Sequence, residues 1–570
     1  MTIMALSYAH GTSTTPLLND TLGGILDKAA ERWPDREAVV VRDQNVRMTF
    51  AQLRDEVDSL ATGLIALGLQ PGDRIGLWSP NKIEWVLSQY ATAKAGLILV
   101  NLNPGYRVAE LEYALNKVEC RALITADQFK TSNYIGMLRE LAPELDHCPP
   151  GALRAARAPH LTTVIHMADT IEPGFYTLSA VQTLGGPAEA TRVAELTSLL
   201  QPDDPINIQF TSGTTGSPKA ATLTHHGVIN NAFFYAEGAG MREGDRPCAT
   251  MPLYHVGGMV LNSIAGVLRG LTLVYLGEAF DPLATLETVQ AEHCTGFGGV
   301  PTMFVAILNH PAFGQYDLSS LRTGGIGGSP CPVDVMWRIM DEMHISHVTI
   351  VYGMTELSGS SVQTASGDSL EQRVTTIGRV PPHMEVKLVN PEGRTVPRGT
   401  QGEICFRGYM VMRGYWNGEA QTRETIDEAR WLHSGDLGTM DEGGYITVTG
   451  RSKDMVIRGG ENIYPREIEE FLFRHPTVAD VQVFGVPDDR YGEELCAWIR
   501  LKPGATATEE EIRAFCRGQI THFKIPRYVR FVDDYPMTVS GKIQKFVMRD
   551  MMTAELAGGR SADVTRQATG

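Results

Sequence analysis

The chain has few cysteines, a shortage of positive charge and no long hydrophobic run, and each shortage excludes a class of protein. Its 570 residues contain eight cysteines, which are scattered and include no Cys-x-x-Cys pair. We therefore expect neither a disulfide framework nor a zinc site, and reduced thiols in a cytosol fit best. Lys and Arg number 50 against 66 Asp and Glu, which gives a formal net charge of −16. Because nucleic-acid binding needs a basic face, this balance argues against a nucleic acid as partner.

Membrane and secretory signals are also missing. The longest apolar run, 256–268, contains Asn262 and Ser263 and is stopped by Arg269, so it is too short and too polar to cross a bilayer. The N-terminus lacks the charged-then-apolar layout of a secretory signal. These features predict a cytoplasmic protein without a transmembrane segment.

Strand-like and helix-like patterns alternate along the first two hundred residues. Thr49 precedes a series of apolar residues at helical spacing over 50–67, which is typical of a capped amphipathic helix. Strand-like runs follow at 74–78, 97–100 and 122–125. The alternation predicts an α/β fold in which layered, mainly parallel sheets are flanked by helices. The segment 148–160, rich in Pro, Ala and Arg, is interpreted as a surface insertion.

The length predicts more than one domain. A polar break at 451–454 predicts a boundary between a large N-terminal domain of several subdomains, 1–450, and a small α+β C-terminal domain, 455–555. In the small domain, Pro465 opens a helix, and Thr508 with Glu511 forms a capping box for another. Strand patterns occupy 478–486, 495–501 and 528–532, and the last residues, 556–570, are expected to be a flexible tail.

The most informative segment reads T-S-G-T-T-G-S-P-K, at 211–219, directly after the apolar run 206–210. Glycine lets the backbone approach a bulky anion, where consecutive N–H groups can converge on its oxygens, and Lys219 adds a mobile positive charge. This combination favours a polyphosphate ligand over a polar surface turn. It differs from the ordinary P-loop, because Gly213 and Gly216 are separated by two residues and Lys219 is followed by Ala220. A metal ion would therefore need a ligand from elsewhere in the chain.

Further motifs offer groups that suit a nucleotide. Y-G-M-T-E, at 352–356, follows a β-branched run, and ligands of open α/β sheets bind at such strand ends. Its Glu356 offers a hard oxygen for Mg²⁺. S-G-D at 434–436 and G-R at 450–451 offer an acidic acceptor for ribose hydroxyls and a fixed cation. Lys542 lies in a late Gly-Lys turn, where a solubility role is the alternative.

Together with H-S-G-D, G-R-S-K-D, R-G-G-E-N-I-Y-P and V-S-G-K, these motifs resemble the adenylate-forming superfamily over about residues 20 to 550. That family contains acyl-CoA synthetases, firefly luciferases and the adenylation domains of peptide synthetases. Within it, the chain is similar to medium-chain fatty acyl-CoA synthetases. The resemblance implies ATP, Mg²⁺ and coenzyme A as cofactors and a small carboxylic acid as substrate, and it leaves a homodimer open.

The resemblance also implies a role for individual residues. The β- and γ-phosphates of ATP would be held by Thr211, Ser212, Gly213, Thr214, Thr215, Gly216, Ser217, Pro218 and Lys219. Adenine would be bracketed by Gly327, Ser329 and Tyr352, and the ribose held by Asp436 and Arg451. Catalytic roles fall to Thr355 at the α-phosphate, Glu356 at Mg²⁺, His255 as a gate and Lys542 in the first half-reaction. The segment 451–454 would be a hinge, with Lys453 at the joint, about which a mobile small domain turns. Gly459 and Gly460 would let the pantetheine of CoA pass.

The acyl site is less sharply defined. Segments 233–235, 252–259 and 297–301 supply aromatic, aliphatic and small residues, with no acid or base suited to an amino acid's ammonium. An apolar slot suits an aliphatic acid of medium length, while an aryl-CoA ligase remains open. A peptide-synthetase module is disfavoured because no carrier-domain serine motif follows, and a luciferase because the peroxisomal tail is missing. A non-catalytic nucleotide sensor is the alternative from another class, and the presence of both Glu356 and Lys542 argues against it.

Overall fold

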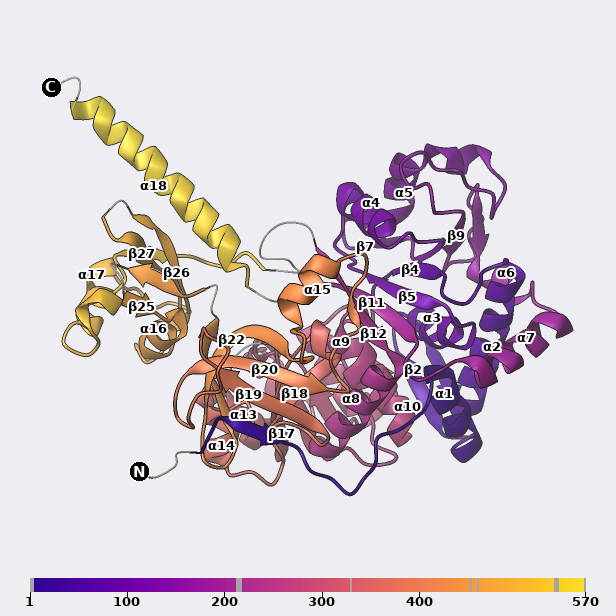
Figure 1. Ribbon diagram of the computed structural model, residues 1–570, viewed down its shortest axis with the longest axis horizontal. Coiled ribbons are helices and arrows are strands. Elements are labelled where there is room, and N and C mark those ends of the chain that lie inside the picture. The colour runs from indigo at the N-terminus through magenta and orange to yellow at the C-terminus, as the bar shows by residue number, and fades with distance from the viewer. Residues whose placement is uncertain are drawn as a thin grey trace. The chain divides into compact units, whose positions relative to one another are not determined.

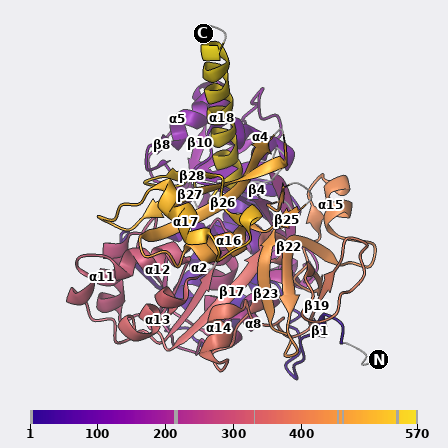
Figure 2. The ribbon, with the colours of Figure 1, turned by 90° about the vertical axis from the view of Figure 1, so that its left-hand side faces the viewer.

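The computed structural model describes residues 5–211, 218–328, 331–451, 454–458, 461–488, 490–537 and 543–567. The chain forms two compact units. We call Ala9–Val386 with Phe406–Leu432 the large unit, and Met1–Tyr8, Lys387–Cys405 and His433–Gly570 the small unit. Their helices and strands are labelled in Figures 1 and 2.

Two eight-stranded sheets form the framework of the large unit. The first has the order β10 (Phe175–Thr177), β9 (Thr163–His166), β6 (Ala122–Thr125), β4 (Arg74–Trp78), β5 (Ile98–Leu102), β11 (Pro205–Thr211), β12 (Lys219–Thr224), β21 (Gly414–Tyr415). The second has the order β18 (Gly359–Gln363), β17 (His347–Met354), β16 (Thr323–Gly327), β15 (Gly296–Gly298), β13 (Pro247–Ala249), β14 (Leu273–Tyr275), β2 (Glu37–Val41), β3 (Val46–Thr49). The central strands of both sheets are parallel and the pairs at their edges include antiparallel ones.

Helices connect and flank these strands. They are α1 (Leu22–Arg32), α2 (Phe50–Ala66), α3 (Ile83–Lys94), α4 (Val108–Lys117), α5 (Tyr134–Leu141), α6 (Leu178–Gln182), α7 (Pro187–Leu199), α8 (His225–Gly238), α9 (Val256–Gly258), α10 (Ala265–Arg269), α11 (Pro282–Glu292), α12 (Pro301–Leu308), α13 (Val333–Glu342), α14 (Leu370–Thr375) and α15 (Glu419–Thr425). Short helices are η1 (Pro143–His147), η2 (Met259–Ile264, a π-helix), η3 (Phe313–Gln315) and η4 (Thr355–Leu357), and β7 (Gln128–Phe129) pairs with β8 (Ser132–Asn133).

Local sequence explains where the elements begin. The hydroxyl of Thr49 accepts a hydrogen bond from the N–H of Gln52, whose side-chain oxygen accepts from the Thr49 N–H, so the predicted cap of α2 is present. Leu53, Val57, Leu60 and other apolar residues at helical spacing are buried on one side of α2. In the central strand β4, all residues from Ile75 to Trp78 are buried, because helices cover both faces of a parallel sheet.

The small unit holds most of a five-stranded sheet with the order β1 (Tyr8–His10), β19 (Met384–Val389), β20 (Gly402–Gly408), β22 (Leu432–Met440), β23 (Ile446–Arg451). It also contains a sheet of β25 (Glu461–Ile463), β24 (Val456–Arg458), β27 (Gly492–Leu501) and β26 (Val478–Asp488), with β28 (Tyr528–Phe531) paired to β27. Its helices are α16 (Pro465–Leu472), α17 (Glu509–Cys516), η5 (His522–Lys524) and α18 (Lys545–Gln567).

Strand β27 shows how this second sheet is covered on both faces. Leu495, Ala497 and Ile499 belong to a core with α16 and α17, whereas Cys496 and Trp498 belong to a core with α18. The alternation follows from the two-residue period of a strand. Helix α18 extends through much of the segment predicted as a flexible tail. The boundary of the domains at 450/451 and the tail stay predictions.

The segment interpreted as a surface insertion, 148–160, does lie mostly at the surface. The segment 148–160 contributes buried side chains at Leu153, Ala155 and Ala158, and the Leu153 N–H donates to the carbonyl of Thr162. These three side chains anchor the segment, and most of its other residues are exposed, as the sequence predicts. Within the described ranges, no helix is both long enough and apolar enough to span a membrane.

Candidate active site

The two ends of the predicted phosphate loop are held together by a β-hairpin. Strands β11 and β12 are antiparallel, and Thr211 pairs directly with Lys219. The carbonyl of Pro218 accepts a hydrogen bond of 3.0 Å from the hydroxyl of Tyr113. Because β11 also pairs in parallel with β5, the loop follows the carboxyl end of a parallel strand, where α/β proteins bind ligands.

Lys219 and Glu356 lie against the same tyrosine, Tyr415. The ammonium of Lys219 is 4.9 Å from the centre of the Tyr415 ring, within the range of a cation–π interaction. The Tyr415 hydroxyl donates to the Glu356 carboxylate (Oε1) at 2.9 Å. Burial, and then the nearby charge of Glu356, raise the pKa of Tyr415, so its hydroxyl remains a donor. The large unit therefore joins the end of the phosphate loop to the predicted magnesium ligand.

The backbone around Glu356 is fixed by its neighbours. Strand β17 continues through Met354, further than the sequence predicts, and η4 then carries Thr355 and Glu356. A Cβ on Gly353 would lie 1.6 Å from the carbonyl oxygen of Gly359, so only glycine fits this contact with β18. The carbonyl of Glu356 accepts from the Met412 N–H at 2.9 Å. Thr355 and Glu356 are 8% and 7% exposed.

Glu356 and Thr355 fit Mg²⁺ by the chemistry of their donors. A carboxylate and a hydroxyl are hard oxygen ligands, and Mg²⁺ in nucleotide enzymes is typically held by one or two carboxylates together with substrate phosphates. Because the Tyr415 bond involves only Oε1, the carboxylate retains capacity to accept or coordinate at its second oxygen.

The predicted adenine-binding residues lie on adjacent strands. Gly327 ends β16, and it pairs with Val351, next to Tyr352 on β17. A Cβ on Gly327 would lie 2.8 Å from the Val351 carbonyl oxygen, so a side chain does not fit there. The Tyr352 ring stacks on Phe406, with ring centroids 6.2 Å apart and planes 27° apart. The Tyr352 ring therefore lies near backbone that carries no side chain, and this arrangement suits a flat base such as adenine.

The predicted ribose-binding residues face each other on paired strands of the small unit. Asp436 on β22 is the antiparallel partner of Arg451 on β23. The Arg451 guanidinium (Nε) donates to the Asp436 carboxylate (Oδ1) at 2.8 Å. The Asp436 side chain is 10% exposed and that of Arg451 63% exposed. The pair supplies a fixed carboxylate with capacity for additional hydrogen bonds.

His255 caps a helix turn at the start of the predicted acyl site. Its Nδ1 accepts a 3.2 Å hydrogen bond from the Gly257 N–H, and α9 passes directly into the π-helix η2. Short π-helical segments inside helices are frequent at functional sites. Buried apolar residues of this region include Leu253, Val256 and Met259.

Two buried asparagines hold the loop that leads to His255. The side-chain oxygen of Asn81 accepts from the Leu253 N–H at 2.8 Å, and its amide donates to the Met251 carbonyl at 3.2 Å. The Asn101 amide donates to the Tyr254 carbonyl at 3.0 Å. These bonds connect the ends of strands β4 and β5 to the 251–254 backbone, at the start of the predicted acyl site.

The other predicted site residues lie outside the described residues. They are Ser212, Gly213, Thr214, Thr215, Gly216, Ser217, Ser329, Lys453, Gly459, Gly460 and Lys542. Their assignments stay predictions.

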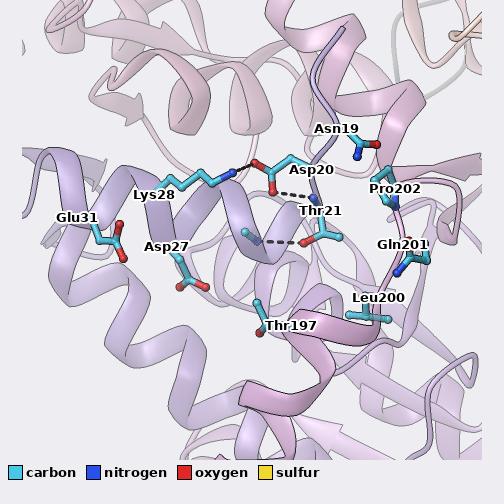
Figure 3. Close-up of a pocket in the computed structure, with 11 residues that line it drawn as sticks. Asn19, Asp20, Thr21, Asp27, Lys28, Glu31, Thr197, Leu200, Gln201 and Pro202 are labelled. Carbon is cyan, nitrogen blue, oxygen red and sulfur yellow. Dashed lines mark hydrogen bonds and ion pairs between the residues drawn. The ribbon is translucent and has the colours of Figure 1, made fainter.

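A separate cavity of about 560 Å³ lies at the start of α1 (Figure 3). Asp20 there pairs with Lys28, and the Thr21 hydroxyl accepts from the Gly24 N–H at 3.2 Å. The hydroxyl bond is the N-cap of α1, so these polar groups have a structural role. None of the predicted site residues that the structure describes lines this cavity.

Several residues of the site were not predicted from the sequence. Tyr415 lies 59 positions from Glu356, and Asn81 lies 172 positions from Leu253. Contacts at such separations follow from the sheet topology, so no local pattern marks these residues.

The fold and the arrangement of the predicted site residues are those of an adenylate-forming enzyme. A family model described as AMP-binding enzyme matches residues 26–416, and one described as AMP-binding enzyme C-terminal domain matches residues 467–542. The chain belongs to the AMP-binding enzyme family.

Among curated proteins, the chain is 48% identical to the mitochondrial medium-chain acyl-CoA ligase ACSF2 of Bos taurus, covering 96% of this chain and 90% of the relative. It is 47% identical to the putative acyl-CoA synthetase YngI of Bacillus subtilis (strain 168), covering 94% and 97%. The solved anthranilate CoA ligase AuaEII, in complex with anthranoyl-AMP, superposes with a TM-score of 0.82 at 26% identity, covering 96% and 99%. The predicted family, α/β fold class, acid–thiol ligase activity and the cofactors ATP, Mg²⁺ and CoA are confirmed.

Proposed function

We propose that this protein is an ATP-dependent acyl-CoA ligase that activates a medium-chain fatty acid as acyl-AMP and then transfers the acyl group to CoA. The observation that carries this proposal is the Lys219–Tyr415–Glu356 contact beside the hairpin loop. Through Tyr415, this contact brings the cation of Lys219, which suits phosphate oxygens, near the carboxylate of Glu356, which suits Mg²⁺. Binding of a nucleotide triphosphate needs both groups.

In the first half-reaction, a carboxylate oxygen of the acid attacks the α-phosphorus of ATP. The bond from this phosphorus to the bridging oxygen breaks, and pyrophosphate leaves with the electron pair. Both reactants are anionic, so catalysis depends on alignment and on opposing the growing negative charge. Bound Mg²⁺ would supply part of that positive charge.

The chain's own residues would align the nucleotide. The 211–219 loop would hold the β- and γ-phosphates and Thr355 would contact the α-phosphate. Lys542 would approach that phosphate as a further cation. Asp436 would accept hydrogen bonds from the ribose hydroxyls, and Tyr352 would flank adenine.

In the second half-reaction, the thiolate of CoA attacks the acyl carbonyl carbon, and the bond to the AMP oxygen breaks. AMP is a good leaving group, whereas the free acid would have to expel oxide. A rotation of domain 455–555 about the hinge 451–454, with Lys453 at the joint, would replace Lys542 by the segment holding Gly459 and Gly460. Glycines there would let pantetheine pass close to the backbone.

The chain-length assignment is supported by the medium-chain ligase among the relatives and by the buried apolar residues between Leu253 and Met259. An aryl-CoA ligase is the second candidate, because AuaEII is an anthranilate CoA ligase of the same fold. Catalytic efficiency (kcat/KM) measured from acetate to palmitate, and with benzoate, separates the two. We expect a maximum at medium chain length, and a maximum at acetate or with benzoate would reject the assignment.

The partial reactions test the mechanism. Carboxylate-dependent ATP–pyrophosphate exchange should be present, and its absence with all of these acids would contradict the ligase function. Lys542→Ala should abolish acyl-AMP formation while sparing thioester formation from supplied acyl-AMP. Equal loss of both partial reactions would show that Lys542 has another role.

Two further predictions concern the protein in the cell. We propose a cytoplasmic location, although the Bos taurus relative is named as mitochondrial, and fractionation of cells that express the full chain tests it. A homodimer would be recognised by light scattering on the purified protein.

A further inference from the structure

One glutamate of the small unit, Glu403 on β20, holds two groups of the H-S-G-D turn. Its Oε2 is 2.8 Å from the Nδ1 of His433, and its Oε1 accepts from the Gly435 N–H at 3.0 Å. The next residue along β20 reinforces this contact, because the Ile404 carbonyl accepts from the Ser434 hydroxyl at 2.6 Å. Three successive residues of the turn, 433–435, are therefore fastened to two successive residues of β20.

The fastened turn ends at Asp436, the predicted ribose ligand. Gly435 has a φ of +73°, a left-handed conformation that favours glycine. The Asp436 N–H donates to the Ser434 hydroxyl at 3.1 Å, and its carboxylate receives Arg451 at 2.8 Å. The Arg451 side chain is largely exposed, whereas Glu403, which fixes the backbone next to Asp436, is more deeply buried.

We propose that Glu403 is a positioning residue for ribose recognition, which acts by fixing the turn that carries Asp436. This inference rests on the proposed role of Asp436. A carboxylate is suited to the task because it can accept from a ring N–H and a backbone N–H at once, one on each oxygen. The side chain is 27% exposed, so the bonds are partly shielded from water.

The neighbouring Cys405 offers a competing explanation. Its Sγ is 3.4 Å from His433 Nδ1, and the ligand atoms of Glu403, Cys405 and His433 all lie within 4.8 Å of one another. A thiolate, an imidazole and a carboxylate would suit Zn²⁺. The hydrogen bonds to Gly435 and to the turn favour the positioning role, since a metal site does not require them.

The test compares ATP with 2′,3′-dideoxy-ATP, which lacks both ribose hydroxyls. Dissociation constants from calorimetry need no acid substrate, so the result is independent of ligase activity. Hydrogen bonds to a charged group predict that the unsubstituted protein binds ATP roughly 10- to 100-fold more tightly than the dideoxy analogue. In Glu403→Ala this ratio should fall about fivefold to tenfold, with binding of the analogue nearly unchanged. Glu403→Gln, which still accepts from Gly435, should recover most of the ratio.

Two comparisons make the result specific. Glu385→Ala removes a carboxylate that is also 27% exposed and pairs with Arg407, and it should leave the ratio unchanged. In an Asp436→Ala background, Glu403→Ala should add nothing, because the two residues act through one contact. Equal weakening of both nucleotides, or additive effects with Asp436→Ala, would overturn the proposal.

The zinc alternative is tested in the same preparations. Tight zinc binding by the unsubstituted protein, lost in Cys405→Ser and required for nucleotide binding, would also overturn it. If Asp436→Ala still prefers ATP over 2′,3′-dideoxy-ATP as strongly as the unsubstituted protein does, the assignment of Asp436 to the ribose is wrong. The ligase function is tested separately, by acid-dependent pyrophosphate exchange.

Discussion

Two buried carboxylates, Glu356 in the large unit and Asp436 in the small unit, have similar exposure and different partners. Both residues are 7% exposed. Glu356 accepts from the neutral hydroxyl of Tyr415, whereas Asp436 accepts from the cationic guanidinium of Arg451. A carboxylate that is to bind a cation benefits from a neutral partner, because a guanidinium would repel the ion. A carboxylate that is to accept hydrogen bonds from hydroxyl groups benefits from a fixed cation, which keeps it oriented.

The largest effect should follow from Glu356→Gln. The amide keeps the shape and removes the charge, so we expect ATP–pyrophosphate exchange to fall about 10²- to 10³-fold, as for the loss of one transition-state charge contact. The apparent Mg²⁺ requirement should rise in the same assay.

Glu292→Gln is the matched control for this prediction. Glu292 has an 8% exposed side chain and pairs with Arg47 and Arg246, away from the predicted site residues. Exchange by the folded Glu292→Gln protein should be unchanged, and a Glu356→Gln enzyme with full exchange would remove the metal-ligand assignment.

A third buried group, His225, shows what burial does without a strong ionic partner. Its Nδ1 accepts from the Leu22 N–H at 3.0 Å, and burial lowers its pKa from 6.5 to about 4, a shift that the charge of Asp204 only partly offsets. Between pH about 6.5 and 4, the unfolded chain therefore binds a proton that the folded protein does not. Stability should fall by about 3 kcal/mol as the pH drops through this window.

His225→Asn isolates that contribution, because its side-chain oxygen can accept from Leu22 and does not titrate. Urea midpoints of the two proteins should differ by a constant amount above pH 7. As the pH falls toward 4, the natural chain should lose stability relative to the variant. Parallel curves for the two proteins would show that His225 titrates normally in the fold.

The residues with a predicted chemical role could be identified from the sequence, whereas the residues that surround and hold them could not. The hairpin loop, Glu356 and Asp436 stand in short motifs whose residue types match a nucleotide, so they are visible without a structure. The partners Tyr415 and Glu403 are brought in by strand pairing across long separations, and a tyrosine or a glutamate in a strand carries no local signal. The extension of β17 to Met354 depends on the contact between Gly353 and Gly359, which is likewise a tertiary property.

Replacing the charged partner should have the next largest effect. Arg451→Met removes the guanidinium from Asp436 and keeps an apolar stem, so we expect ATP binding to weaken about 10-fold. Arg451→Lys should recover part of the loss, since an ammonium retains the charge without the planar fork. Calorimetric titration with ATP measures the affinity of both variants. An unchanged affinity in Arg451→Met would mean that Asp436 keeps its orientation without the guanidinium.

Replacing the neutral partner should have the smallest effect. Tyr415→Phe removes the hydroxyl that donates to Glu356 and keeps the ring face beneath Lys219, so the catalytic efficiency with ATP should fall about fivefold, or about 1 kcal/mol. Tyr415→Leu also removes the ring, and a further loss of about threefold is expected, because the cation–π contact is lost too. Tyr415→Phe should therefore be milder than both Glu356→Gln and Arg451→Met. If Tyr415→Phe instead matched Glu356→Gln, the hydroxyl would itself contact the nucleotide or its metal, and the contrast between a neutral and a charged partner would not explain the two sites.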